Sequence, residues 1–222
     1  MDKGGVARFF DAIAAGYDRS YAPAASDSRL RMKQVIAELP SPPARVLDLG
    51  VGTGRELPAL LDAGHRPTGV DVSEAMLACC ARRARPIPLV RADFWVAPLP
   101  FDSDSFDAAI ALHGTLAHPD DLAAVSRLGR ELGRVVRRGG RFVAEVPSIA
   151  WLDAAAALAT DEHRRVIRTG DRTCIYEDAN AGVSIRALLL DEREWADSLA
   201  PHWTARIEPR DAYEWLVIAE RV

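Results

Sequence analysis

The chain has 222 residues, of which 49% are hydrophobic and 27% charged, and its formal net charge is −4. This composition is typical of a single soluble globular domain, and the acidic balance argues against a nucleic-acid partner, which needs a basic surface. No signal-peptide core, membrane-length apolar run, disulfide pattern or metal-ligand spacing is visible, so we expect a cytoplasmic protein with free thiols, no metal and no membrane partner.

Two amphipathic helices are predicted before residue 40. Apolar residues recur at helical spacing in Val6–Tyr17 and in Ser26–Leu39. The residues between them, Tyr17-Asp18 and Tyr21-Ala22-Pro23, predict a loop. Two roles stay open for Tyr17. It could be a core aromatic at the end of its helix, or it could face a ligand.

The most informative stretch is Val46-Leu47-Asp48-Leu49-Gly50-Val51-Gly52-Thr53-Gly54. The run Arg45–Leu49 is short and apolar and follows the breaker Ser41-Pro42-Pro43, which predicts a buried strand. Leucines at helical spacing follow the glycines as far as Gly64, so the unit is strand, glycine loop and helix. Such a loop at the carboxyl end of a parallel strand binds nucleotide-like ligands, because glycine permits close approach to the backbone.

The spacing of the glycines separates two kinds of ligand. A dinucleotide fingerprint reads G-x-G-x-x-G, whereas here Gly54 comes one residue early and Asp48 precedes the first glycine. A carboxylate is unfavourable beside a diphosphate and favourable beside a positively charged ligand. The pattern D-x-G-x-G-x-G resembles motif I of the class I S-adenosylmethionine (SAM) methyltransferases. This resemblance implies a cofactor with a sulfonium, an ammonium, a ribose and an adenine.

A second strand is predicted at Pro67-Thr68-Gly69-Val70-Asp71, followed by a helix that Ser73 caps. An acid at the end of this strand is the ribose-hydroxyl position of nucleotide-binding α/β sheets. The stretch Asp71-Val72-Ser73-Glu74-Ala75-Met76-Leu77 is very similar to the methyltransferase sequence at this point. The resemblance implies that Asp71 accepts both ribose hydroxyls; a surface aspartate ahead of a helix cap is the alternative.

Two further strands are predicted at Pro88–Arg91 and Ala108–Leu112, and the second is a continuous apolar run of the kind buried in parallel sheets. The sequence Ala92-Asp93-Phe94-Trp95 lies between them. The family resemblance puts Asp93 near the adenine amino group and Phe94 against the base. A purely core-filling role for Phe94 stays open.

The residues after the fourth strand contain two candidate catalytic histidines, His113 and His118. They follow the carboxyl end of a central strand, where chemistry is expected in such sheets. The stretch Leu112–Asp120 resembles the loop of glycine N-methyltransferase-like and amino-sugar N-methyltransferases, and this resemblance puts His118 at the position of a catalytic base. Histidine suits that role because its ordinary pKa lies near working pH. Helix capping or packing is the alternative role for His118.

A helix starting at Asp121 is predicted to end at Gly139-Gly140, followed by a fifth strand at Arg141–Val146. Three arginines are expected near the carboxyl end of this helix, where they complement its dipole: Arg134, Arg137 and Arg138.

From Pro147 onward the pattern changes to a short Ala-rich helix at Trp151–Leu158 and an antiparallel meander. Its predicted strands are Arg165–Arg168, Arg172–Tyr176 and Val183–Leu190. Asp191 with Glu194 predicts a capping box for the next helix. The last two strands are predicted at Trp203–Ile207 and Glu214–Val222.

The order of these elements predicts an α/β fold, and the family resemblance implies a Rossmann-like, seven-stranded, mostly parallel sheet with an antiparallel last strand and helices on both faces. The family resemblance implies a small antiparallel β insertion as a substrate cover. It divides the single domain into a helical lid (1–40), a SAM-binding core (41–146), the cover (147–190) and a carboxyl-terminal helix and strand pair (191–222).

The function implied by the resemblance is SAM-dependent methyl transfer to a nitrogen or oxygen of a small molecule. The predicted cofactor-binding residues are Tyr17, Asp48, Gly50, Val51, Gly52, Gly54, Asp71, Val72, Met76, Ala92, Asp93, Phe94, Leu112 and His113. One rival is a catalytically silent SAM-binding partner or sensor domain, which would carry the same motifs. Another is an NAD(P)-dependent oxidoreductase, which the early third glycine and Asp48 disfavour. The identity of the acceptor and the choice between monomer and homodimer stay open.

Overall fold

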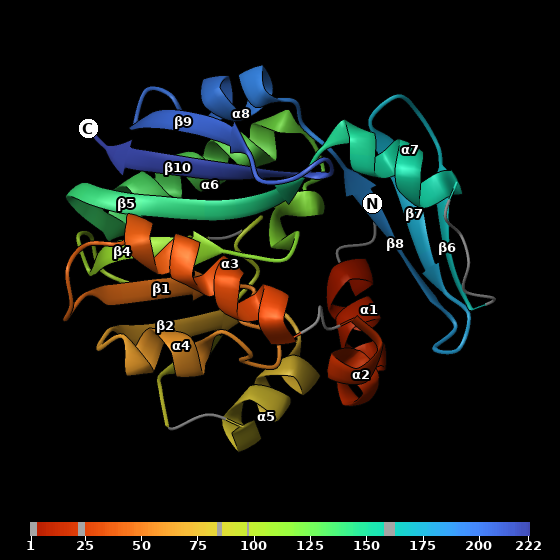
Figure 1. Ribbon diagram of the computed structural model, residues 1–222, viewed down its shortest axis with the longest axis horizontal. Helices are drawn as coiled ribbons and strands as arrows, with labels where there is room; N and C mark the ends of the chain where they lie inside the picture. The colour runs from red at the N-terminus through yellow and green to blue at the C-terminus, as the bar shows by residue number, and fades with distance from the viewer. Residues whose placement is uncertain (1–3, 22–24, 84–85, 97, 158–162) are drawn as a thin grey trace.

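The computed structural model describes residues 4–21, 25–83, 86–96, 98–157 and 163–222, and within them seven strands form one sheet in the order β3-β2-β1-β4-β5-β10-β9 (Figure 1). In that order the strands are Leu89–Arg91, Arg66–Asp71, Arg45–Leu49, Phe106–Ala111, Val136–Pro147, Glu214–Arg221 and Trp203–Pro209. Strands β1 to β5 pair in parallel, and β10 is antiparallel to both of its neighbours. The predicted Rossmann-like sheet is confirmed.

The strand order places a crevice at the carboxyl ends of β1 and β4. From β1 the chain moves outward to β2 and β3, then returns to β4 on the other side of β1 and continues to β5. The connections leaving β1 and β4 therefore diverge to opposite sides. In open α/β sheets, ligands bind at this switch point.

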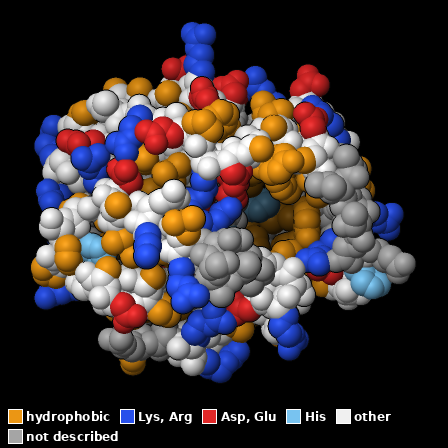
Figure 2. Space-filling view, viewed as in Figure 1, with side chains coloured by type: hydrophobic (Ala, Val, Ile, Leu, Met, Phe, Trp, Pro, Cys, Tyr) orange, Lys and Arg blue, Asp and Glu red, His pale blue; other side chains and the backbone are white. Residues whose placement is uncertain are grey.

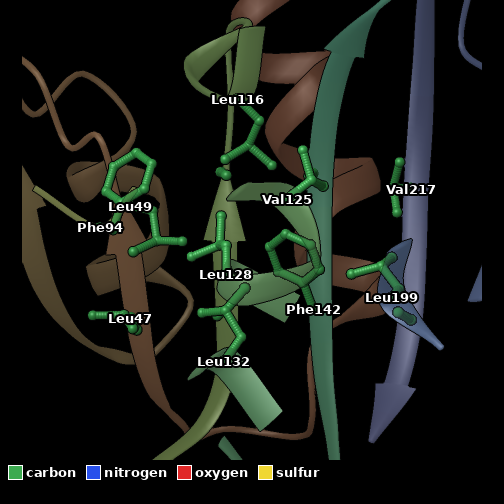
Figure 3. Close-up of a cluster of buried hydrophobic side chains, with 14 of the residues drawn as sticks. Leu47, Leu49, Phe94, Leu116, Val125, Leu128, Leu132, Phe142, Leu199 and Val217 are labelled. Atoms are coloured by element: carbon green, nitrogen blue, oxygen red, sulfur yellow. The ribbon is translucent and has the colours of Figure 1, made fainter. Parts of the chain in front are cut away.

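Helices cover both faces of the sheet, as predicted. One face carries α3 (Ala25–Glu38), α4 (Leu57–Asp62) and α5 (Glu74–Arg83), and the other carries α6 (Leu122–Val135) and α8 (Glu192–Leu199). Figure 3 shows the core on the second face, where Leu128 and Leu132 of α6 lie close to Phe142 of β5 and Leu199 of α8, each at most 3% exposed. The predicted capping box of Asp191 and Glu194 begins α8.

The amino-terminal segment is more helical than predicted. Helix α1 (Gly4–Ile13) and a 3₁₀ turn at Ala14–Gly16 lead into α2 (Tyr17–Tyr21), so the prediction of a loop at Tyr17-Asp18 is wrong. The physical reason is the spacing of Tyr17 and Tyr21, which lie one helical turn apart and stack with ring centroids 5.1 Å apart. Tyr21, also predicted in the loop, is the last residue of α2, and residues 22–23 of the predicted loop lie outside the described residues.

The end of α6 also differs from the prediction. The helix ends at Val135 and β5 begins at Val136, so Arg137 and Arg138 lie in a strand and not in a last helical turn. Val136 is β-branched and fully buried, which favours an extended chain from that residue onward. Gly139-Gly140 then form an irregularity in the pairing of β5 with β4 instead of a helix stop.

A separate antiparallel sheet of three strands follows β5 in the described part of the chain. Helix α7 (Ile149–Ala157) precedes β6 (Arg164–Arg168), β7 (Thr173–Asp178) and β8 (Val183–Leu188), which pair in the order β6-β7-β8. Residue 158, the predicted end of α7, lies outside the described residues. In Figure 1 this small sheet stands beside the large one, with α1 and α2 between them.

Helix α1 joins the two sheets. Its residues Phe9 and Ile13 are buried in one cluster with Met76 of α5 and Ile185 of β8. None of the helices in the described ranges is long and apolar enough to cross a bilayer.

Replacement of Gly140 by alanine is expected to destabilise the fold. An added Cβ would lie 2.5 Å from Val136 Cγ1 and 2.7 Å from the carbonyl oxygens of Arg137 and Asp107, and backbone atoms cannot rotate away. Overpacking of this kind costs about 1–3 kcal/mol, which in a chain of this size lowers the Tm by roughly 3–10 °C. Calorimetric melting measures this directly.

Gly5→Ala is the matched control, because an added Cβ at Gly5 meets nothing within 4 Å. Since alanine is favoured over glycine in a helix, the control should melt at the wild-type temperature or slightly above it. A Gly140→Ala variant with an unchanged Tm would contradict the packing described here.

Candidate active site

The glycine loop after β1 is held against two neighbouring strand ends. Gly50 and Gly52 have φ values of +65° and +54°, a backbone region that glycine adopts without a steric cost. A Cβ on Gly50 would lie 2.4 Å from Thr115 Cγ2, so the loop packs directly on the segment after β4. On its other side, the Gly52 N–H donates to Asp71 Oδ2 at 2.9 Å.

A cavity, here called the loop cavity, lies over these glycines, and most of the predicted cofactor-binding residues line it. They are Tyr17, Asp48, Gly50, Val51, Gly52, Asp71, Val72, Met76, Asp93, Phe94, Leu112 and His113. Gly54 and Ala92 do not line it. A Cβ on Gly54 would lie 2.7 Å from Cys80 Sγ, so this glycine lets α5 approach the loop. The Ala92 N–H donates to the Asp71 carbonyl oxygen. Ala92 therefore contributes a backbone hydrogen bond beside the cavity and no lining side chain.

The lining of the loop cavity is acidic. In the described structure its charged residues are the carboxylates Asp48, Glu56, Asp71 and Asp93, and the guanidinium of Arg55. Burial raises the pKa of Asp48, and the nearby carboxylates Glu56 and Asp71 raise it further. Burial also raises the pKa of Asp71, against the opposing effect of the N–H groups of Ser73 and Gly52. Crowded, buried carboxylates of this kind suit a ligand that brings positive charge or hydroxyl donors.

The lid helices are attached to this cavity by carboxylates that the sequence analysis did not single out. Ser73 Oγ donates to Asp11 of α1 at 2.6 Å. Thr53 Oγ1 donates to Asp18 of α2 at 2.7 Å, and Arg83 forms an ion pair with Asp18. The same Ser73 hydroxyl accepts the N–H of Met76, as predicted for a helix cap. The lid is therefore tied to the glycine loop and to the start of α5.

His113 is held between two carboxylates. Its Nε2 lies 2.5 Å from Glu56 Oε1, and its backbone N–H donates to Glu145 Oε2 at 3.2 Å. Its φ of +54° is unusual for a residue with a side chain, and these contacts hold it there. Burial raises the pKa of Glu56, but the hydrogen bond and charge of His113, together with Arg55, outweigh burial and lower it.

His118 presents a different arrangement. Its Nδ1 lies 2.9 Å from the Arg186 carbonyl oxygen. Because a carbonyl only accepts, Nδ1 carries the hydrogen, and in the neutral ring Nε2 then holds the lone pair. Burial lowers the pKa of His118, and the Arg186 carbonyl only partly opposes this. The ring therefore stays neutral at pH 7, with one basic nitrogen.

A second cavity, here called the outer cavity, has a volume of about 520 Å³ and lies between the lid, α3, α7 and the small sheet. Figure 2 shows a hollow lined largely by hydrophobic side chains on this face of the molecule. The two cavities adjoin, because six residues line both: Phe10, Tyr17, Arg55, His113, Gly114 and His118. Both predicted catalytic histidines thus lie at the junction.

Comparison with known proteins assigns the central region to a family. Residues 47–144 match the model of the methyltransferase domain, and the sheet order is the one expected for that fold. The central region of the chain, residues 47–144, is therefore similar to the methyltransferase domain. The predicted family is confirmed, and the prediction of SAM as cofactor agrees with it.

Two curated relatives of this methyltransferase domain match part of the chain. An uncharacterized protein of Methanocaldococcus jannaschii is 31% identical over 155 residues, which are 68% of this chain and 56% of that protein. A demethylmenaquinone methyltransferase of Clavibacter sepedonicus is 34% identical over 145 residues, which are 63% of this chain and 57% of that enzyme. The matched region thus spans little more than half the length of either relative.

A solved structure is similar over a larger part of the chain. The amino pentose methyltransferase CalS10 of Micromonospora echinaspora, solved with SAM bound, superimposes with a TM-score of 0.68 at 20% identity. The superposition covers 94% of this chain and 95% of that chain. At this level of identity the likeness concerns the fold.

The Glu56–His113 pair predicts a pH-dependent contribution to stability. A carboxyl whose pKa is lowered on folding stabilises the protein above its unfolded pKa of about 4.3, and this contribution is lost as the pH falls through the folded value. Glu56→Gln should therefore lower the free energy of unfolding by about 1–3 kcal/mol at pH 7. The difference from wild type should shrink below about pH 4. Urea unfolding at several pH values measures both effects.

Glu208→Gln is the control, because Glu208 is 54% exposed where it pairs with Arg206. An exposed pair contributes only about 0–1 kcal/mol. A loss in Glu56→Gln that does not change with pH would contradict an ionised Glu56 that is stabilised in the folded chain.

Proposed function

We propose that this chain is a SAM-dependent methyltransferase that transfers a methyl group to a nitrogen or oxygen of a small molecule and releases S-adenosylhomocysteine. The observation that carries the proposal is the pair of adjoining cavities, one over the glycine loop and one under the small sheet, with His118 lining both. When bound, SAM supplies a methyl group on a positively charged sulfur.

The acidic lining of the loop cavity supports this cofactor. A sulfonium and an ammonium are cations, and four carboxylates line the cavity. Asp71 accepts one backbone N–H on each oxygen, and because a carboxylate oxygen has two lone pairs, capacity remains for ribose hydroxyls. A diphosphate beside these carboxylates would be repelled, which disfavours an NAD(P)-dependent oxidoreductase.

The chain's main task in the reaction is alignment. The transferred methyl group is already activated by the cofactor, so the protein has to hold the acceptor in line and exclude water. The hydrogen bonds of Asp11 and Asp18 hold the lid helices over the loop cavity and so help to exclude water from it. A base is needed only where the acceptor arrives with a proton. The neutral His118 fits that role better than His113, whose Nε2 is engaged by Glu56.

The rival of a catalytically silent SAM-binding domain has the same loop cavity. It does not require the outer cavity, whose volume of about 520 Å³ lies in the range of small-molecule sites. Turnover with candidate acceptors separates the two functions.

Cofactor binding is the first test of the proposal. The purified chain should bind SAM and S-adenosylhomocysteine and should not bind NAD or NADP in a calorimeter. Asp71→Asn should weaken S-adenosylhomocysteine binding about ten- to hundred-fold, because hydrogen bonds to a charged group contribute roughly 1.5–3 kcal/mol.

Asp197→Asn is the matched control, since Asp197 is 76% exposed on α8, and its affinity should equal that of wild type. Binding of a dinucleotide without binding of S-adenosylhomocysteine would refute the proposed cofactor. An unchanged affinity in a folded Asp71→Asn variant would refute the ribose position.

The role of His118 is the second test. Asparagine keeps a hydrogen-bond donor but cannot take a proton at neutral pH. His118→Asn should therefore lower single-turnover methyl transfer about 10²–10⁴-fold and leave cofactor affinity nearly unchanged. The ordinary pKa of histidine is about 6.5, and that of His118 is lowered by burial. The wild-type rate should therefore persist below about pH 6.5. It should decline only as the pH falls through the lowered pKa of His118.

His163→Asn, at an exposed histidine, is the control and should behave as wild type. If the His118→Asn variant keeps the wild-type rate and the same decline of the rate at low pH, then the role of His118 is structural.

A further inference from the structure

The loop cavity holds a single guanidinium among its described carboxylates. Its acidic lining residues are Asp48, Glu56, Asp71 and Asp93. Among the described lining residues, Arg55 is the only arginine or lysine. Its side chain is 14% exposed, and its Nη1 is buried without a hydrogen-bond partner in the described part of the chain. Because a buried guanidinium nitrogen without an acceptor is costly, a ligand oxygen beside Nη1 would be stabilising.

The neighbours of Arg55 orient its side chain without satisfying this nitrogen. Its Nε lies 3.8 Å from a carboxylate oxygen of Asp18 and 3.9 Å from one of Glu56. These separations exceed hydrogen-bond distance. The guanidinium carbon lies 5.3 Å from the centre of the Tyr17 ring, and a ring face attracts a cation without accepting its N–H groups in plane. The guanidinium is therefore held at the cavity wall with a donor still available.

The backbone donors of the glycine loop are largely used by the chain itself. The Gly52 N–H donates to Asp71 Oδ2 at 2.9 Å. The N–H groups of Val51 and Gly54 donate to backbone carbonyl oxygens at 3.0 and 2.9 Å. In loops that bind phosphates, such N–H groups point at the anion instead. Three donors that this loop could offer to an anion are thus occupied, and the guanidinium of Arg55 is a cationic donor that remains.

The proposed cofactor brings one anionic group into this acidic cavity. SAM carries two cations, the sulfonium and the α-ammonium, and one anion, the α-carboxylate. The two cations suit the carboxylates of the lining, whereas the α-carboxylate would be repelled by them. Arg55 and Glu56 present charges of opposite sign within 3.9 Å of each other. An α-amino acid likewise carries its anion and its cation on one carbon atom.

We propose, resting on the methyltransferase function above, that Arg55 binds the α-carboxylate of SAM through its guanidinium. A guanidinium can donate two parallel N–H groups to one carboxylate, which adds directional specificity to the charge attraction. Arg55 lines both cavities, whereas Asp71 lines only the loop cavity. The proposal therefore gives the cofactor a direction, with its ribose at Asp71 and its amino-acid end at the junction of the cavities.

The test compares SAM with decarboxylated SAM, which lacks only the α-carboxylate, by calorimetry. Decarboxylated SAM has one more net positive charge, so the acidic lining alone would favour it. If Arg55 binds the carboxylate, the wild-type chain should bind SAM about ten- to hundred-fold more tightly than decarboxylated SAM. Arg55→Gln should lose this preference, because SAM binding weakens while binding of decarboxylated SAM stays unchanged or becomes tighter.

Arg193→Gln is the matched control, because Arg193 is 91% exposed on α8 and this variant should keep the wild-type preference. Equal affinities of the two ligands for the wild-type chain, or an unchanged preference in Arg55→Gln, would overturn the proposal. Should Arg55→Gln bind neither ligand, Arg55→Lys decides. It keeps the charge without the planar fork and should prefer SAM less strongly than wild type, and an equal preference would count against Arg55.

The wild-type measurements also separate this proposal from the function on which it rests. A wild-type chain that binds neither SAM nor S-adenosylhomocysteine would refute the methyltransferase function itself. A wild-type chain that binds SAM and decarboxylated SAM equally well would refute only the role of Arg55.

Discussion

The hydrogen bond from the Gly52 N–H to Asp71 is the interaction on which the rest of the site depends. It joins the loop after β1 to the end of β2 at 2.9 Å, and Asp71 accepts the Ser73 N–H with its other oxygen. One buried carboxylate thus orders a glycine loop and the start of α5 together. The cost of burying that charge is offset by these donors. The same two hydrogen bonds hold the Asp71 carboxylate at the wall of the loop cavity.

Local sequence patterns were sufficient for most of the fold. Short apolar runs ending in Asp48 or Asp71 specify strands, because buried parallel strands need little alternation. Prediction failed where a local stop signal competed with side-chain packing. Gly139-Gly140 suggested a helix end, but the buried, β-branched Val136 already begins the extended chain of β5. At Tyr17, stacking on Tyr21 favoured a helical turn over the expected loop.

The candidate site was predictable only in its sequence-local part. The glycines and Asp71 belong to motifs that stand together in the chain. The contact between Glu56 and His113 joins residues 57 positions apart, and Asp11 reaches Ser73 across 62 positions. No periodicity encodes such pairs, since they depend on which strand ends meet at the switch point. Arg55 directly follows Gly54 in the motif, but the sequence analysis did not predict it as a site residue. Its position between the two cavities depends on the same long-range contacts.

Aromatic side chains of the lid lie at the junction of the two cavities, where charged groups of both signs meet. Opposite charges at the junction attract more strongly when water is excluded, because the interaction scales inversely with the local dielectric constant. Phe10 and Tyr17 line both cavities, and the Arg55 guanidinium lies 5.3 Å from the centre of the Tyr17 ring. A ring face holds a cation without neutralising it. The lid can therefore hold Arg55 in place beside Asp18 and Glu56 and help to exclude water from the junction.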